Sequence, residues 1–123
     1  MVRVRHADRP GLRIRVVLAD RLVLGPGRAD LLAGIAETGS IAASGRRLAM
    51  SYKRAWQLVE DMNSGFASPL VEAAKGGAHG GGARLTELGE AVLAAYRSLE
   101  AACGEAAAPA LERLGAALAP KPR

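Results

Sequence analysis

The fold of this chain is decided by the stretch from Gly39 to Met62, GSIAASGRRLAMSYKRAWQLVEDM. Ser40 and Ser51 each precede a segment with helical periodicity, and serine in that position caps a helix N-terminus. Residues 49–51 separate the two segments and form a tight turn. The second segment has an apolar stripe at helical spacing that we expect to be core: Tyr52, Ala55, Trp56, Val59 and Met62. The stretch therefore predicts a helix-turn-helix.

The other side of the second helix carries Lys53, Arg54 and Gln57 near its beginning, and two acids near its end. This order opposes the helix dipole, because each cation in the first turn forgoes about 0.3–1 kcal/mol. Exposed charges are common and their individual energies are small, so a solvated basic face is one interpretation. The other is a recognition helix, whose N-terminal residues, here from Ser51 onward, contact DNA bases and phosphates. The charge order favours the second interpretation.

Composition narrows the class of protein. The chain has 123 residues, half of them hydrophobic, which suits one domain with one core. A net charge of +5 favours an anionic partner, and nucleic acid is the commonest one. The single Cys103 excludes an internal disulfide and suits a reducing compartment. No apolar run approaches the roughly 20 residues that span a bilayer, and no signal peptide is evident, so we expect a cytoplasmic protein without a membrane partner.

The segment before the helix-turn-helix contains an arm, strands and one helix. Residues 1–11 are rich in arginine and read as a mobile basic arm, for which contact with DNA phosphate is one option. Apolar residues alternate from Leu12 to Leu18, which predicts a half-buried strand. A second short strand is expected over 20–24, and a helix over 28–38 that ends at Gly39.

A hairpin is expected after the helix-turn-helix, with strands over 70–74 and 83–85 around a glycine-rich tip. Such a tip could bind the phosphates of a nucleotide, although the Walker pattern is missing. It could also be a flexible surface loop, since glycine needs no partner to explain flexibility. The third interpretation is a wing along the DNA backbone. In this wing, Lys75, His79 and Arg84 would supply positive charge. Glycines such as Gly76 and Gly77 would let backbone N–H groups come close to DNA phosphates.

A long helix is predicted from the cap residue Thr86 to about Ala108, and Pro109 is expected to break or restart it. Its apolar stripe comprises Leu88, Val92, Tyr96, Leu99 and Cys103, and leucines continue it after the proline at 111, 114 and 118. The stripe either packs within one monomer or forms a dimer seam. The seam would contain Leu99, Leu111, Leu114 and Leu118. The predicted regions are thus the arm at 1–11, a domain at 12–108 and a helical extension with a tail at 109–123.

Residues suited to catalysis are scarce. The chain has two histidines and one cysteine, and it lacks a carboxylate pair and the spacings typical of metal sites or catalytic triads. We therefore predict a binding protein with neither a catalytic nor a metal site.

The order of the predicted elements is similar to a winged helix-turn-helix: mainly α with a small β component, a β-hairpin wing and a long C-terminal helix. The string SYKRAW, followed by VEAAKGGAHGGGARLTELG, resembles the DNA-binding domain of the ModE family of molybdate-responsive transcription regulators. The resemblance covers residues from about Arg28 to Ala101. The helix-turn-helix alone is also similar to that of LysR-type regulators.

The resemblance implies a homodimer that binds a palindromic operator in double-stranded DNA. The implied contacts are Ser51, Tyr52, Lys53, Arg54 and Gln57, with the glycine-rich wing beside them; Ser40 joins this predicted surface at the start of the first helix. Dimerisation is implied for the N-terminal strand region, which includes Leu12 and Ile14.

Family members sense molybdate through a separate C-terminal module, and nothing after Leu118 matches it. We therefore expect no cofactor in this chain, whereas molybdenum-linked gene control stays plausible by association. A protein-interaction adaptor is the competing class: its long helix would bind another protein and its basic face would be incidental.

Overall fold

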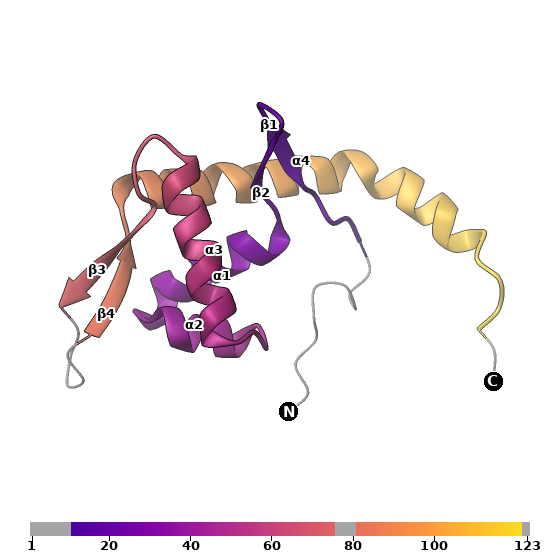
Figure 1. Ribbon diagram of the computed structural model, residues 1–123. Helices are drawn as coiled ribbons and strands as arrows, with labels where there is room; N and C mark the ends of the chain where they lie inside the picture. The colour runs from indigo at the N-terminus through magenta and orange to yellow at the C-terminus, as the bar shows by residue number, and fades with distance from the viewer. Residues whose placement is uncertain (1–10, 76–80, 122–123) are drawn as a thin grey trace.

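Helices and two antiparallel hairpins follow one another in the computed structural model, which describes residues 11–75 and 81–121 (Figure 1). The N-terminal hairpin consists of β1 (Val16–Leu18) and β2 (Arg21–Leu24). Three helices come next, α1 (Pro26–Thr38), α2 (Ile41–Arg47) and α3 (Tyr52–Gly65). A second hairpin, β3 (Val71–Lys75) and β4 (Gly81–Leu85), precedes the long helix α4 (Glu87–Ala116). The predicted fold class and order of elements are confirmed.

The hydrophobic core lies between α1, α3, the second hairpin and the first half of α4. Its largest fully buried apolar side chains are Leu31, Leu32, Ile35, Met62 and Leu70, and Tyr96 joins them from α4. Leu24 at the end of β2 is also buried, which ties the N-terminal hairpin to the same core. The helix-turn-helix is therefore supported from behind by α1 and α4.

Small residues let the three helices before the second hairpin pack closely. The Ser44 hydroxyl of α2 donates a hydrogen bond to the Leu31 carbonyl of α1 at 2.8 Å. A Cβ at Gly34 would lie only 2.0 Å from that hydroxyl oxygen. At the next contact, a Cβ at Gly45 would lie 3.0 Å from the Cβ of Ala55 in α3. Gly39 ends α1 with a φ of 71°, a left-handed conformation that suits glycine.

Hydrogen bonds hold the base of the second hairpin against α3 and α4. Asn63 accepts from the backbone N–H groups of Leu70 and Val71 at 2.9 and 3.1 Å, and donates to the Val71 carbonyl at 3.0 Å. The Thr86 N–H donates to the Leu70 carbonyl at 2.9 Å. The Ala83 N–H of β4 donates to the Gly39 carbonyl at 2.9 Å, so the hairpin is also joined to the corner between α1 and α2.

The N-terminal hairpin is shorter than the sequence predicted. The expected strand from Leu12 to Leu18 is wrong over its first four residues, because β1 begins at Val16. Leu12 and Leu18, which were expected on the core face, are exposed. The segment before β1 instead contacts α4 through its backbone, since the Tyr96 hydroxyl donates to the Ile14 carbonyl at 2.6 Å. The predicted second strand and the helix after it are confirmed by β2 and α1.

The long C-terminal helix is continuous, so the break expected at Pro109 is wrong. α4 has 30 residues and includes Pro109 in its interior. Proline removes one backbone donor, which is costly in a buried helix, but this half of α4 is exposed and water can bond the freed carbonyl. The predicted boundary between 108 and 109 consequently falls inside a single helix, whose second half extends beyond the other elements (Figure 1).

Candidate nucleic-acid interface

The second helix of the helix-turn-helix, α3, presents its polar side to solvent. Ser51 caps the helix by accepting a hydrogen bond from the Arg54 N–H at 3.0 Å. The opposite side of α3 is buried through Ala55, Leu58, Val59 and Met62. This burial holds Lys53, Arg54 and Gln57 outward, and all three are exposed.

Near the start of α3, its basic side is not paired with any acid in the described part of the chain. Within residues 11–75 and 81–121, the Lys53, Arg54 and Gln57 side chains make no recorded hydrogen bond or ion pair. Asp61, near the end of α3, is paired with Arg28 of α1 at 3.6 Å. The first half of α3 therefore offers cationic and amide donors to an external partner.

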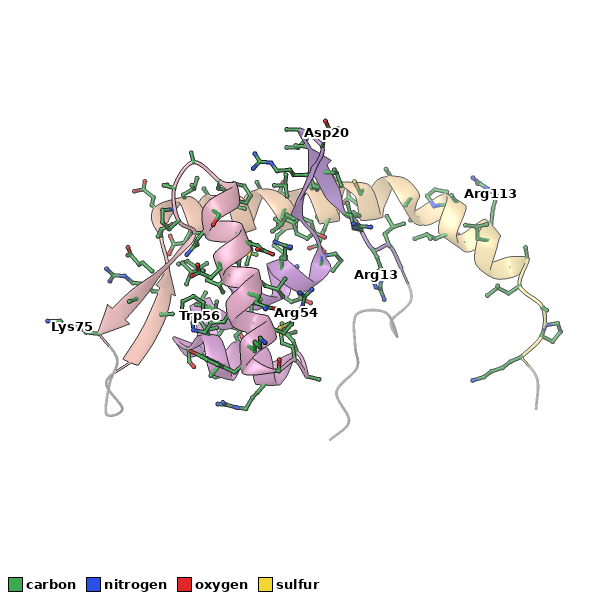
Figure 2. The ribbon with its side chains drawn as sticks, in the orientation of Figure 1. Arg13, Asp20, Arg54, Trp56, Lys75 and Arg113 are labelled. Carbon is green, nitrogen blue, oxygen red and sulfur yellow. The ribbon has the colours of Figure 1, made fainter. Side chains whose placement is uncertain are left out.

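The aromatic residues of α3 are placed differently from the prediction. Tyr52 and Trp56 were expected in the core, but they are 57% and 40% exposed. Leu58 takes the place in the core that the sequence assigned to Trp56. The Trp56 Nε1–H donates a hydrogen bond to the Tyr52 hydroxyl at 2.6 Å. Figure 2 shows Trp56 on the side of α3 toward the second hairpin, with Arg54 on the other side.

An open groove of about 500 Å³ lies between α2, α3 and the second hairpin. Its walls come from the start of α2, the aromatic pair of α3 and both strands of the hairpin, and include Ser40, Ile41, Tyr52, Trp56, Val71, Ala73 and Ala83. Two carboxylates, Glu60 and Glu72, also line it. Ser40, one of the predicted contact residues, lines this groove and caps α2 by accepting a hydrogen bond from the Ala43 N–H at 3.0 Å.

The second hairpin places two of its predicted contact residues. Lys75 ends β3 and is exposed, well away from the core (Figure 2). Arg84 lies opposite Glu72 in the β3–β4 register, and its Nε donates to the Glu72 carboxylate at 2.9 Å. Gly76, Gly77 and His79 lie outside the described residues. Sequence reasoning missed the Glu72–Arg84 pair, although opposite charges at facing positions of a hairpin could have indicated it.

The residues predicted for a dimer seam differ in exposure. Leu114 and Leu118 are 66% and 77% exposed, while Leu12 and Leu99 are exposed to a smaller extent. Leu111 and Ile14 are half-buried.

An ion-pair network that the sequence did not indicate holds α4 to α1. Arg97 bonds to Asp30 and Glu100, each at 2.9 Å. Burial acts to lower the pKa of Arg97, but these two hydrogen bonds outweigh it and raise the pKa. Burial, followed by the negative charge of Glu100, raises the pKa of the neighbouring Tyr96. Arg97 therefore joins α4 to α1, and Tyr96 joins α4 to the segment before β1.

These features define the class of fold: a winged helix-turn-helix, with α2 and α3 as the motif and β3–β4 as the wing. A solved structure with this architecture is the CbnR_DBD–DNA complex, with a TM-score of 0.55 and 24% sequence identity. The match covers 72% of this chain and 94% of that chain. At this identity the likeness establishes the fold alone.

No helix in the described part of the chain has the length and apolar character needed to cross a membrane.

Curated relatives confirm the resemblance to ModE-type regulators. The molybdenum-pterin-binding protein MopB of Rhodobacter capsulatus is 51% identical over 78 residues, which are 63% of this chain and 29% of MopB. The transcriptional regulator ModE of Yersinia pestis is 44% identical over 64% of this chain and 30% of that protein. The DNA-binding transcriptional dual regulator ModE of Escherichia coli K12 is 40% identical over the same shares. The matched part of this chain spans about 30% of these relatives' length. No protein-family model matches it.

Proposed function

We propose that this chain is a transcription regulator that binds double-stranded DNA through α3 and the β3–β4 wing. The observation that carries the proposal is the exposed group of Lys53, Arg54 and Gln57, which has no side-chain partner among residues 11–75 and 81–121, on a helix whose other side is buried. The regulatory and DNA-binding names of the relatives and of the structural neighbour support it. An incidental basic face gives no reason for a charge order that opposes the helix dipole.

The geometry suits the major groove of DNA. α3 has 14 residues and is about 21 Å long, and the major groove, about 12 Å wide, admits a helix. The Arg54 guanidinium can bond the two acceptors of guanine, and the Gln57 amide matches adenine. Lys75 at the end of β3 and Arg84 on β4 would contact phosphates, which provide affinity but carry no sequence information.

We also propose a homodimer on a palindromic operator. α4 is about 45 Å long, and its second half carries the exposed Leu114, with Leu118 just beyond it. An apolar row of this kind is costly in water, and a second copy related by two-fold symmetry could cover it. The two α3 helices would then lie about 34–36 Å apart, one turn of DNA.

The names of the relatives support a link to molybdenum-dependent gene control.

Gel-shift titration at several salt concentrations tests the proposal. The wild type is expected to bind duplex DNA with an affinity that falls steeply with salt, because each neutralised phosphate contributes a slope of about −0.9. Arg54→Ala and Gln57→Ala should each cost about 1–3 kcal/mol on a duplex selected by the wild type, and little on random DNA. Arg113→Ala removes an arginine far from α3 and the wing and serves as the control (Figure 2). Because Arg113 adjoins Leu114 of the proposed dimer seam, this variant must also sediment as the wild type does.

The titration also separates this proposal from the adaptor. A folded wild type that binds no duplex at low salt would refute DNA binding and favour a protein-interaction adaptor that uses α4. Equal losses for Arg54→Ala and Arg113→Ala would indicate attraction by net charge without a recognition helix.

A further inference from the structure

We propose that Trp56 is a positioning residue for DNA contact, a role that rests on the proposed function. Its indole N–H holds the Tyr52 hydroxyl so that the phenolic proton is donated to a phosphate oxygen of a DNA strand lying in the groove between α3 and the wing. The observation behind this is the Trp56–Tyr52 hydrogen bond of 2.6 Å at the mouth of the groove.

The direction of this hydrogen bond determines what Tyr52 can do. Indole Nε1 is a donor only, so the Tyr52 oxygen must be the acceptor. The hydroxyl then keeps its own proton for a second bond and needs an acceptor as its partner. Hydrogen bonds in a chain polarise one another, so a hydroxyl that accepts from Trp56 is a better donor. A phosphate oxygen accepts only, and it fits this donor.

Trp56 combines a large apolar ring system with one polar N–H, and here that N–H has a partner on the surface. Trp56 is the only tryptophan of the chain and remains 40% exposed beside an open groove. Phenylalanine at this position would still line the groove with Val59 and Ala83, but it would lack the donor. The feature that tryptophan adds at this site is thus the bond to Tyr52.

The position of the pair around α3 favours the DNA backbone over base edges. Residues of an α-helix are about 100° apart, so Tyr52 lies about 140° around the axis from Gln57. When the Gln57 side meets the bases, the Tyr52 side faces the wall of the major groove and the wing. The two carboxylates of the groove are compatible with a phosphate here. Glu72 is paired with Arg84, and Glu60 lies eight residues beyond Tyr52, about 12 Å along α3.

The experiment compares wild type, Tyr52→Phe, Trp56→Phe and the double variant on two duplexes. One duplex is selected from a random pool by the wild type, and the other has random sequence. Each single variant should bind both duplexes about 10-fold more weakly, the loss expected for one hydrogen bond to a charged acceptor. The double variant should also lose about 10-fold, since either change removes the same unit. The salt slope should stay unchanged, because a neutral donor releases no counterion.

Controls separate positioning from folding. Tyr96→Phe removes a tyrosine hydroxyl that bonds the Ile14 carbonyl, away from the groove, and should leave DNA affinity unchanged. Thermal unfolding of every variant shows whether Trp56→Phe acts through stability. Tyr52→Phe carries little folding risk because that side chain is 57% exposed, so it tests the proposal by itself.

Distinct results would overturn the inference. Wild-type affinity in Tyr52→Phe would exclude the phosphate contact, and a 100-fold loss in the double variant would show that the two residues act independently. A loss confined to the selected duplex would place the contact on a base. A folded wild type that binds neither duplex would instead refute the proposed function itself.

Discussion

Replacing Gly34 with alanine tests the close packing of α1 against α2, on which the orientation of the helix-turn-helix depends. The new Cβ would lie 2.0 Å from the Ser44 hydroxyl oxygen and 2.9 Å from the Ser44 Cβ. The hydroxyl would have to leave the Leu31 carbonyl, and a buried hydroxyl without a partner costs about 1–3 kcal/mol. Ser44 Cβ can move only with the backbone, and such overpacking costs about 1–3 kcal/mol.

The gain in helix propensity offsets part of this cost. Alanine is favoured over glycine in a helix by about 1 kcal/mol, so Gly34→Ala should lower the free energy of unfolding by about 1–5 kcal/mol in total. Urea titration followed by circular dichroism measures the change. For a domain of this size, at roughly 3–6 °C per kcal/mol, the thermal midpoint should fall by roughly 3–30 °C.

The chain provides a matched control and a suppressor. Gly104 lies inside α4 with open space around it, so Gly104→Ala should stabilise by up to about 1 kcal/mol. In a Ser44→Ala background the hydroxyl is gone, but the Cβ of residue 44 remains 2.9 Å from the new Cβ at position 34. The destabilisation caused by Gly34→Ala should therefore be only partly relieved in that background. If Gly34→Ala matched the wild type in stability, or gained as much as Gly104→Ala, the packing argument would be wrong.

The remaining predictions concern the wing, the dimer, molybdate and alkaline pH. Glu72→Gln should strengthen binding to any duplex because it releases Arg84. Arg84→Ala should weaken binding to all duplexes about equally and flatten the salt slope by about one unit. If gel shifts showed that Arg84→Ala changes the sequence preference, Arg84 would not be a phosphate contact. Sedimentation should show a dimer at tens of micromolar for the wild type and a monomer for Leu114→Glu/Leu118→Glu, and a monomeric wild type would exclude the seam. Calorimetry should detect weak or no molybdate binding, because an oxyanion of that size needs several converging donors in a dehydrated pocket; micromolar affinity would overturn this prediction. Burial raises the pKa of Tyr96, so the folded state holds the phenolic proton more tightly than the unfolded chain does. The protonated Tyr96 therefore contributes its full stabilisation below the unfolded pKa near 10, and this contribution is lost as pH rises through the folded pKa. Denaturation at pH 8 and 11 should show a smaller alkaline loss for Tyr96→Phe, and an unchanged loss would assign the effect to other groups.

Local signals in the sequence determined where helices begin and end. Ser40, Ser51 and Thr86 each cap a helix as predicted, accepting a backbone N–H through the side-chain oxygen. Gly39 ends α1 in the left-handed conformation. These features depend on residues within one helical turn, so the sequence alone could predict them. Turn and periodicity signals likewise predicted the second hairpin and the order of elements, and the fold confirms both.

Contacts between distant segments decided which side chains are buried and where the groove lies. Helical periodicity placed Tyr52 and Trp56 on an apolar stripe, but it could not tell a stripe that faces the core from one that faces a groove. The groove exists only because the base of the wing is bonded to Asn63 and Gly39. The assignment of DNA contacts to Lys53, Arg54 and Gln57 stays a prediction.

The two ends of the described chain also show the difference between what local sequence predicts and what tertiary contacts decide. Proline predicted a break at position 109 from backbone chemistry alone, yet α4 continues because its exposed carbonyls can bond water. Alternation predicted a strand from Leu12, yet the hairpin pairs only from Val16, where β2 supplies a partner. A strand forms only with a neighbour and a side chain is buried only against another segment, and both depend on the arrangement of the whole chain in space.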